Sequence, residues 1–216
     1  MPEQALPWVS IVIILLSVSL HEFAHAKSAD SSGDPTPRSQ GRVTLNPLAH
    51  LDPLGTLMII VTSLTGFGIG WGKPVIVNPR YMQNPRVDHF LSVLWGPLTN
   101  FILAVVFAIA YRYAALPSGN EMFIYVCLLG TIINIGLCFF NLIPLGPLDG
   151  HWLLAALLPA RIGARFGIWS RTYGTMILFT IILLDGFISN MTNRPTILSI
   201  VLRDPMVRVS QLLLGT

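Results

Sequence analysis

The segment HEFAH, residues 21–25, places two imidazoles and a carboxylate at the end of an apolar run. On an α-helix, residues i and i+4 share a face, so His21 and His25 would project together with Cβ atoms about 6 Å apart, a span that can chelate zinc. Glu22 would lie about 100° around the helix, beside the metal, where a general base acting on water belongs. The alternative is that these are polar residues at a helix end that reach toward the membrane interface.

The composition is that of a membrane protein. Of the 216 residues, 53% are hydrophobic and 11% are charged, and the mean hydropathy is +0.67. Ionisable groups in a membrane segment are costly, so the HEFAH cluster favours a functional role. The net charge of +3 is spread thinly, and no basic patch indicates a nucleic-acid partner. Cys127 and Cys138 would lie about 16 Å apart on one helix, which excludes a disulfide between them.

Four apolar segments are long enough to cross a bilayer, which requires about 20 residues. They are Leu6 to Ala26, Phe90 to Tyr111, Met122 to Leu142, and Ile168 to Ile188. A fifth, Leu54 to Leu64, is too short and runs into the glycine-rich GFGIGWG, residues 66–72. Because irregular backbone cannot face lipid in the hydrocarbon core, this piece is expected to be re-entrant and covered by protein, or to line a wet cavity.

We therefore expect an all-α polytopic membrane protein with four full spans, a short re-entrant helix and β element, and interfacial C-terminal helices. The interfacial helices are expected between Ile197 and Leu214, interrupted by Pro205. Residues 1–216 are expected to form one membrane domain.

The positive charges indicate a topology. With a re-entrant fifth segment, nine cations lie in loops on one side of the membrane, and Arg112 alone lies in the short loop opposite. The nine are Lys27, Arg38, Arg42, Lys73, Arg80, Arg86, Arg161, Arg165 and Arg171. The amino terminus is then outside and the HEFAH end of the first helix is cytoplasmic, although Arg194, Arg203 and Arg208 in the tail depart from the rule.

A cleaved signal peptide is an alternative for the first segment, because Ala24-His25-Ala26 has the form of a cleavage site. The residues before the apolar run carry Glu3 and no lysine or arginine. This charge pattern favours a retained helix.

A catalytic zinc site normally has three protein ligands, so His21 and His25 require a third. Asp149 is the strongest candidate, because it lies in FNLIPLGPLDG, residues 140–150, where prolines and glycines break the third span on the same side as His21. Broken backbone at that depth should border a cavity. The alternative is that Asp149 only caps the helix beginning at His151, and the residues alone leave both interpretations open.

Four motifs follow one another along the chain. They are HEFAH at 21–25, a glycine-rich stretch with G-x-G at 67–72, GPLTN at 96–100, and Asn141-x-x-Pro144-x-x-x-x-Asp149-Gly150. Together they resemble the site-2 protease family of intramembrane zinc metalloproteases, over most of the chain. With no PDZ or CBS domain, the chain is similar to the minimal branch of that family.

The resemblance implies that His21, His25 and Asp149 hold one zinc ion, that Glu22 is the base, and that Asn141 helps to hold unwound substrate. It implies single-span membrane proteins as substrates, such as transcription-factor precursors, anti-sigma factors or remnant signal peptides. We expect a prokaryotic cytoplasmic membrane, with the site toward the cytoplasm as the distribution of cations indicates. The oligomeric state is left open.

Cleavage requires an extended substrate, because a helix hides its peptide carbonyls in internal hydrogen bonds. An exposed edge around Gly68 and Gly70 could pair with such a substrate, since no Cβ obstructs the approach of another chain. The alternative is that these glycines only make the loop flexible.

Other polar residues have competing interpretations. His151 stands where the family often has a small residue, and it is interpreted as interfacial rather than as a partner of a metal ligand. Asp52 is expected to cap a helix or turn and His50 to lie at the interface, with lining of the site as the alternative. Asn100 either contacts substrate or backbone, or ties two helices together.

Other functions also use such ligands. A prenyl-protein-processing zinc peptidase would take a glutamate as third ligand, and Glu3 and Glu121 are wrongly placed. A zinc or divalent-metal transporter, or a non-cleaving metal-binding membrane protein, is the alternative outside enzymes. A transporter needs further polar residues along its path, and the third span offers only Thr131, Asn134 and two thiols. The intact Glu22 argues against an inactive protease.

Overall fold

The computed structural model describes residues 6–65, 70–192 and 199–215, and within these ranges the secondary structure is helical. Among the described residues, four helices are long and apolar enough to cross a membrane. They are α1 (Leu6–Ser31), α4 (Pro85–Ala110, prolonged by a π-helical turn at Tyr111–Ala115 and by α5, Leu116–Ser118), α6 (Glu121–Asn141) and α8 (Ala160–Thr192). The predicted all-α polytopic architecture is confirmed.

The shorter elements lie between and after these helices. They are α2 (Thr36–Ser39), 3-10 turns at Pro47–Ala49 and Pro79–Tyr81, α3 (Pro53–Thr65), α7 (Gly150–Leu157), a π-helical turn at Ser199–Arg203 and α9 (Asp204–Leu214). The fifth apolar segment forms α3, whose 13 residues span about 20 Å, less than the roughly 30 Å of a hydrocarbon core. It is too short to cross, as predicted.

Local sequence explains where helices begin. Asn120 caps α6, because its Oδ1 accepts a hydrogen bond from the backbone N–H of Phe123 at 3.1 Å. Asp52 caps α3 in the same way, accepting from the N–H of Gly55 at 2.7 Å. The capping role predicted for Asp52 is therefore confirmed.

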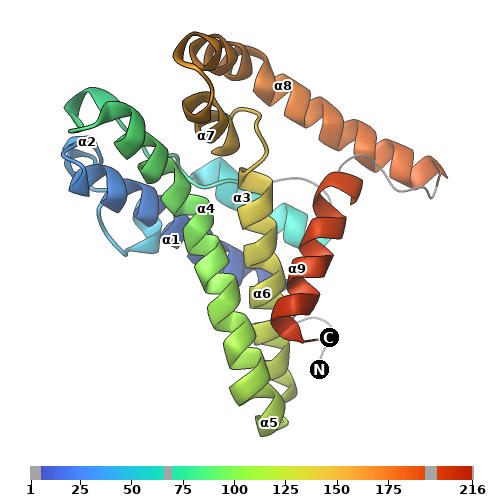
Figure 1. Cartoon of the computed structure of the whole chain (residues 1–216). Coiled ribbons are helices and arrows are strands. Elements are labelled where there is room, and N and C mark those ends of the chain that lie inside the picture. The colour runs from blue at the N-terminus through green and yellow to red at the C-terminus, as the bar shows by residue number, and fades with distance from the viewer. Residues whose placement is uncertain (1–5, 66–69, 193–198, 216) are drawn as a thin grey trace.

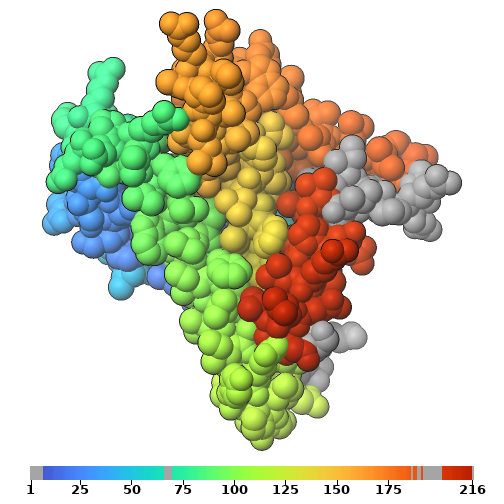
Figure 2. Space-filling model, in the orientation of Figure 1, coloured from blue at the N-terminus to red at the C-terminus, as the bar shows by residue number. Residues whose placement is uncertain are grey.

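Helices α1, α4 and α6 pack against one another and form the centre of the molecule. Figure 1 shows α4 and α6 running side by side, with α9 alongside α6. In the space-filling view of Figure 2, α4 and α9 are both in contact with α6. Helix α8 packs mainly on α7. Large apolar side chains are exposed on all four long helices, including Leu16, Ile102, Ile132 and Leu183. Such outward-facing apolar surface is what a lipid environment covers.

Helix α9 was expected to be interfacial, and the structure adds a packing role. It lies against α6 and α4, and the Arg112 guanidinium donates to the Leu212 carbonyl at 2.7 Å. Leu214 is buried, whereas Leu212 is exposed.

The expected β element is reduced, in the described residues, to one antiparallel bridge between Leu51 and Gly72. Lys73 N–H donates to the His50 carbonyl at 2.8 Å beside it. A longer ladder cannot form there, because the partner stretch is only the short link between the turn at Pro47–Ala49 and α3. Residues 70–78, hereafter the extended segment, have no regular secondary structure apart from this bridge.

A buried arginine fixes the extended segment. Arg42 is 2% exposed, and its guanidinium donates to the carbonyl of Ala49 at 2.7 Å and to that of Lys73. At the other end, Asp34 accepts from the N–H of Asn78 at 2.6 Å. Both contacts join the extended segment to the loop that follows α1.

We predict that Arg42→Ala loosens the extended segment. The carbonyls of Ala49 and Lys73 then lose their buried charged donor, and each lost hydrogen bond costs about 1–3 kcal/mol. Amide exchange at Lys73 and Val75 should therefore accelerate at least about tenfold. Hydrogen-exchange mass spectrometry measures this. Arg38→Ala is the matched control, because Arg38 pairs with Asp30 while 69% exposed and should leave exchange unchanged. Equal amide exchange in both variants would contradict the role of Arg42 in fixing the extended segment.

Candidate metal centre

The two histidines of HEFAH lie on α1 and are buried. Because the helix is continuous through residues 21–25, both rings project from one face, and their Nε2 atoms are 3.0 Å apart. Each ring presents its other nitrogen to an oxygen of α4. His21 Nδ1 lies 2.6 Å from Oδ1 of Asn100, and His25 Nδ1 lies 2.8 Å from the carbonyl of Ser92.

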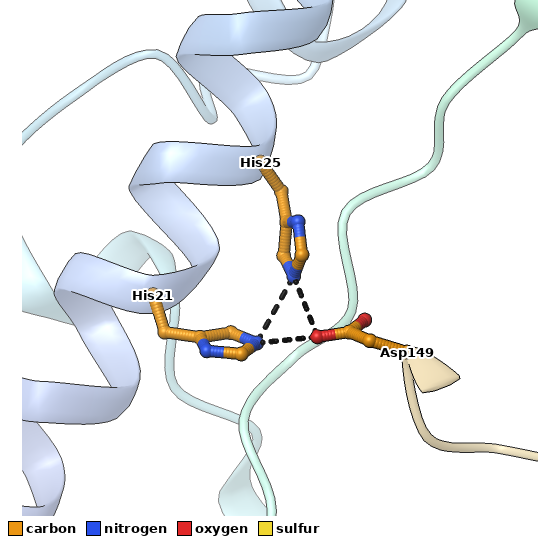
Figure 3. A group of neighbouring side chains, drawn as sticks. All are labelled: His21, His25 and Asp149. Atoms are coloured by element: carbon orange, nitrogen blue, oxygen red, sulfur yellow. Dashed lines mark hydrogen bonds and ion pairs between the residues drawn. The ribbon is translucent and has the colours of Figure 1, made fainter. Parts of the chain in front are cut away.

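Asp149 reaches the same point from the break between α6 and α7. Its Oδ2 lies 3.1 Å from His21 Nε2 and 3.3 Å from His25 Nε2, and Figure 3 shows the three side chains converging from two elements. Asp149 occupies the N-cap position of α7, yet its side chain accepts no capping hydrogen bond. The interpretation of Asp149 as only a helix cap is therefore wrong.

The donor set fits a zinc ion. Ligands about 2.0–2.1 Å from zinc at the corners of a tetrahedron lie about 3.4 Å from one another, close to the three separations observed here. Among the described residues, His21, His25 and Asp149 form a group of ligand atoms within 4.8 Å of one another. With Nδ1 of each neutral ring donating to an oxygen, both Nε2 atoms present lone pairs toward a carboxylate. The two lone pairs and the carboxylate oxygen repel one another, and a cation between these three atoms would remove the repulsion.

The electrostatics agree with a cation site. Burial raises the pKa of Asp149, but positive charge on the two imidazoles, when they are protonated, outweighs burial and holds this pKa well below its usual range. The carboxyl is therefore an anion at neutral pH. Its Oδ2 is buried without a hydrogen-bond partner, and a bound cation would satisfy it.

Glu22 faces the same cavity as the three ligand candidates, a space of about 530 Å³. Its Oε2 accepts from the N–H of Val75 at 3.1 Å and lies 3.7 Å from the Arg42 guanidinium. Burial lowers the pKa of Arg42, and Glu22 opposes that shift. Glu22, the base predicted from sequence, thus extends from α1 to the extended segment, which holds its carboxylate.

The predicted substrate residues fall partly within this cavity. Asn141 lines it, and its amide nitrogen donates to the Leu137 carbonyl at 2.9 Å. Gly70 also lines it, but a Cβ there would collide with Ile59 of α3, so packing against α3 already requires a glycine. Gly68 lies outside the described residues.

Two histidines expected at the interface are buried instead. His50 is fully buried, with Nε2 2.8 Å from the Thr44 carbonyl, because the loop after α1 folds over it. His151 is 3% exposed, and its Nδ1 hydrogen-bonds the Leu148 carbonyl in the turn that starts α7. Both side chains are therefore covered by protein, and their position relative to the membrane interface stays a prediction.

Sequence reasoning gave no site role to Arg42 or Asn134, although both adjoin the predicted machinery. Arg42 was counted only as a loop cation, and Asn134 only as a polar residue of the third span. The available signal was the position of Asn134, an amide in the middle of an apolar helix, which is costly unless it has a partner.

The fold and the site define a multi-pass membrane protein with a two-histidine, one-carboxylate centre suited to zinc. Known proteins agree. The chain is 34% identical over 189 residues to YwhC of Bacillus subtilis strain 168, named as a candidate zinc metalloprotease, covering 83% of this chain and 82% of YwhC.

Two further relatives carry the same description. Rip2 of Mycolicibacterium smegmatis is 31% identical over 140 residues, covering 65% of this chain and 53% of Rip2. Rip2 of Mycobacterium tuberculosis H37Rv is 32% identical over 146 residues, covering 67% and 54%. No protein-family model and no solved structure matches. The chain belongs to the zinc metalloprotease family of YwhC and spans about half the length of the Rip2 proteins.

We predict that Gly96→Ala abolishes tight zinc binding. Gly96 of α4 faces the ligands, and a Cβ there would overlap both imidazoles. Zinc affinity, measured by chelator competition, should fall at least about tenfold, because one methyl displaces two ligands.

Gly167→Ala in α8 is the control for this variant. Its added methyl would lie 3.8 Å from the Ala155 Cβ, an ordinary contact. Alanine favours either helix by about 1 kcal/mol, so both proteins should fold. Equal zinc affinity in the two variants would show that the observed approach of α4 to the histidines is wrong.

Proposed function

We propose that this protein is an intramembrane zinc metalloprotease of the site-2 type, hydrolysing peptide bonds in or near the transmembrane segments of single-span membrane proteins. The observation that carries the proposal is the meeting of HEFAH with Asp149 beside a cavity among apolar helices. The residues proposed as ligands of one zinc ion per chain are His21, His25 and Asp149.

A zinc ion held by His21, His25 and Asp149 would supply Lewis-acid activation of water and of the scissile carbonyl. Glu22 takes the proton of the attacking water and delivers it to the leaving amine. Its place on the cavity wall supports this role. The contacts with the Val75 N–H and Arg42 hold the carboxylate toward the extended segment.

The same cavity supports recognition of an unwound substrate. The extended segment forms one wall through Gly70 and Val75, and α6 contributes Asn141 on another. Backbone groups along such a segment can pair with a second extended chain. Asn141 is proposed to hold that chain, and so is the edge around Gly68 and Gly70.

We also propose that the protein lies in a prokaryotic cytoplasmic membrane with the site toward the cytoplasm. The excess of lysine and arginine in the loops on the HEFAH side supports this orientation. The lipid bilayer is then both solvent and the route by which substrates arrive.

The divalent-metal transporter is the alternative to test against. Its prediction of a polar path has weak support, because the described part of the chain offers one group of three potential ligands. The buried amides of Asn100 and Asn134 hydrogen-bond each other at 3.1 Å rather than extend that group.

We predict that Glu22→Gln keeps about one zinc ion per chain and cuts at least about 100-fold more slowly, because an amide cannot accept the proton. Metal analysis and mass spectrometry of transmembrane-peptide cleavage, on purified protein in detergent, measure both quantities. Glu121→Gln, at an exposed glutamate in the first turn of α6, is the matched control and should bind and cut like the wild type.

The outcome separates the two functions. Cleavage by the wild type and the control alone supports a protease with Glu22 as its base. If all three proteins bind zinc, none cuts, and zinc crosses liposome membranes, the transporter replaces the protease.

A further inference from the structure

Asn134 lies in the middle of α6. One residue, Asn100, lies between it and His21 of the candidate metal centre. Asn134 is fully buried, as is Asn100 of α4. The Nδ2 of Asn100 donates to Oδ1 of Asn134 at 3.1 Å, and Oδ1 of Asn100 lies 2.6 Å from Nδ1 of His21. A continuous line of hydrogen bonds thus runs from α6 through α4 to a ligand on α1.

The direction of every bond in this line is determined at its far end. The Nδ2 of Asn134 lies 2.9 Å from the carbonyl of Gly130, which can only accept. Asn134 must therefore present Oδ1 to Asn100. Asn100 must then present Nδ2 to Asn134, where the carbonyl of Ser17 is a second acceptor at 3.5 Å. Only Oδ1 of Asn100 is left for His21.

An acceptor at His21 Nδ1 decides which ring nitrogen carries the proton. Nδ1 has to donate, so Nε2 keeps its lone pair and faces His25 and Asp149. With the amide of Asn100 reversed, Nδ1 would accept, and a proton on Nε2 would point into the centre. His25 has no such dependence, because the acceptor at its Nδ1 is the backbone carbonyl of Ser92.

We propose that Asn134 is a positioning residue that sets the tautomer of His21 through Asn100, so that α6 tunes the zinc affinity of a site whose three ligands lie outside it. This inference rests on the proposed role of His21 as a zinc ligand. Outer partners of ligating histidines typically affect metal affinity 10–100-fold, and Asn134 acts one bond further out.

Zinc affinity of the full chain, measured by chelator competition, tests the proposal. Asn134→Leu should bind zinc about 10-fold more weakly, because Asn100 then loses the partner that orients it. Asn134→Asp should stay within about threefold of the wild type, since a protonated carboxyl still donates to Gly130 and accepts from Asn100. A purely structural role would not rank these two variants in that order.

Thr131→Val is the matched control. Thr131 is as buried as Asn134 and lies one turn earlier on α6, but its hydroxyl donates within its own helix to the Cys127 carbonyl at 2.9 Å. Its removal should leave zinc affinity unchanged. Folded Asn134→Leu with wild-type zinc affinity would overturn the proposal.

Nitrogen-15 NMR of histidine-labelled, metal-free wild type at alkaline pH gives a test that does not depend on any variant of Asn134 folding. His21, assigned by its absence in His21→Gln, should be the Nδ1–H tautomer, and an Nε2–H tautomer would overturn the proposal. This result is also separable from the proposed function. A wild type that binds no zinc refutes the ligand role, whatever the tautomer.

Discussion

Two imidazole nitrogens and a carboxylate oxygen lie 3.0–3.3 Å apart inside a packed bundle of helices, and the rest of the structure serves that convergence. Without a cation, three electron-rich atoms at this distance repel one another in surroundings of low dielectric constant. Helix α4 can approach α1 closely because residue 96 is a glycine. The break between α6 and α7 brings Asp149 inward. Both features lower helix regularity or side-chain packing, and the proposed role of His21, His25 and Asp149 as metal ligands explains why they are present.

The second organising feature is the wall opposite the histidines. Glu22 lies where α1, the extended segment and Arg42 meet, so the position of the base depends on how the loop after α1 is folded. The same guanidinium holds the carbonyls of Ala49 and Lys73. A change in the extended segment, such as pairing with a bound chain, would therefore alter the contacts that position the Glu22 carboxylate. If the extended segment binds substrate as proposed, Arg42 would couple that binding with Glu22, the proposed base.

Periodicity and motif spacing predicted the spans, the i and i+4 histidine pair and the cap at Asp52, because all of these depend on contacts within a few residues. The residues alone left Asp149 open between ligand and cap, and only the fold brings it to His21. The contacts of Arg42 with Glu22 and Lys73, and of Asn134 with Asn100, join positions 20 to 34 residues apart, so local sequence does not reveal the partners. The burial of His50 and His151 was missed for the same reason: hydropathy marks a histidine as polar, whereas the loops that cover it are set by tertiary structure. In the described residues the β element is one bridge, because the chain that faces Gly72 is too short for a longer ladder.

Zinc K-edge X-ray absorption of the purified wild type tests the central claim most directly, because it reads the ligands without a variant. The account predicts only nitrogen and oxygen neighbours at about 2.0–2.1 Å, with the outer scattering of two imidazole rings. Sulfur at about 2.3 Å, which Cys127 or Cys138 would supply, or a number of imidazoles other than two, would contradict it.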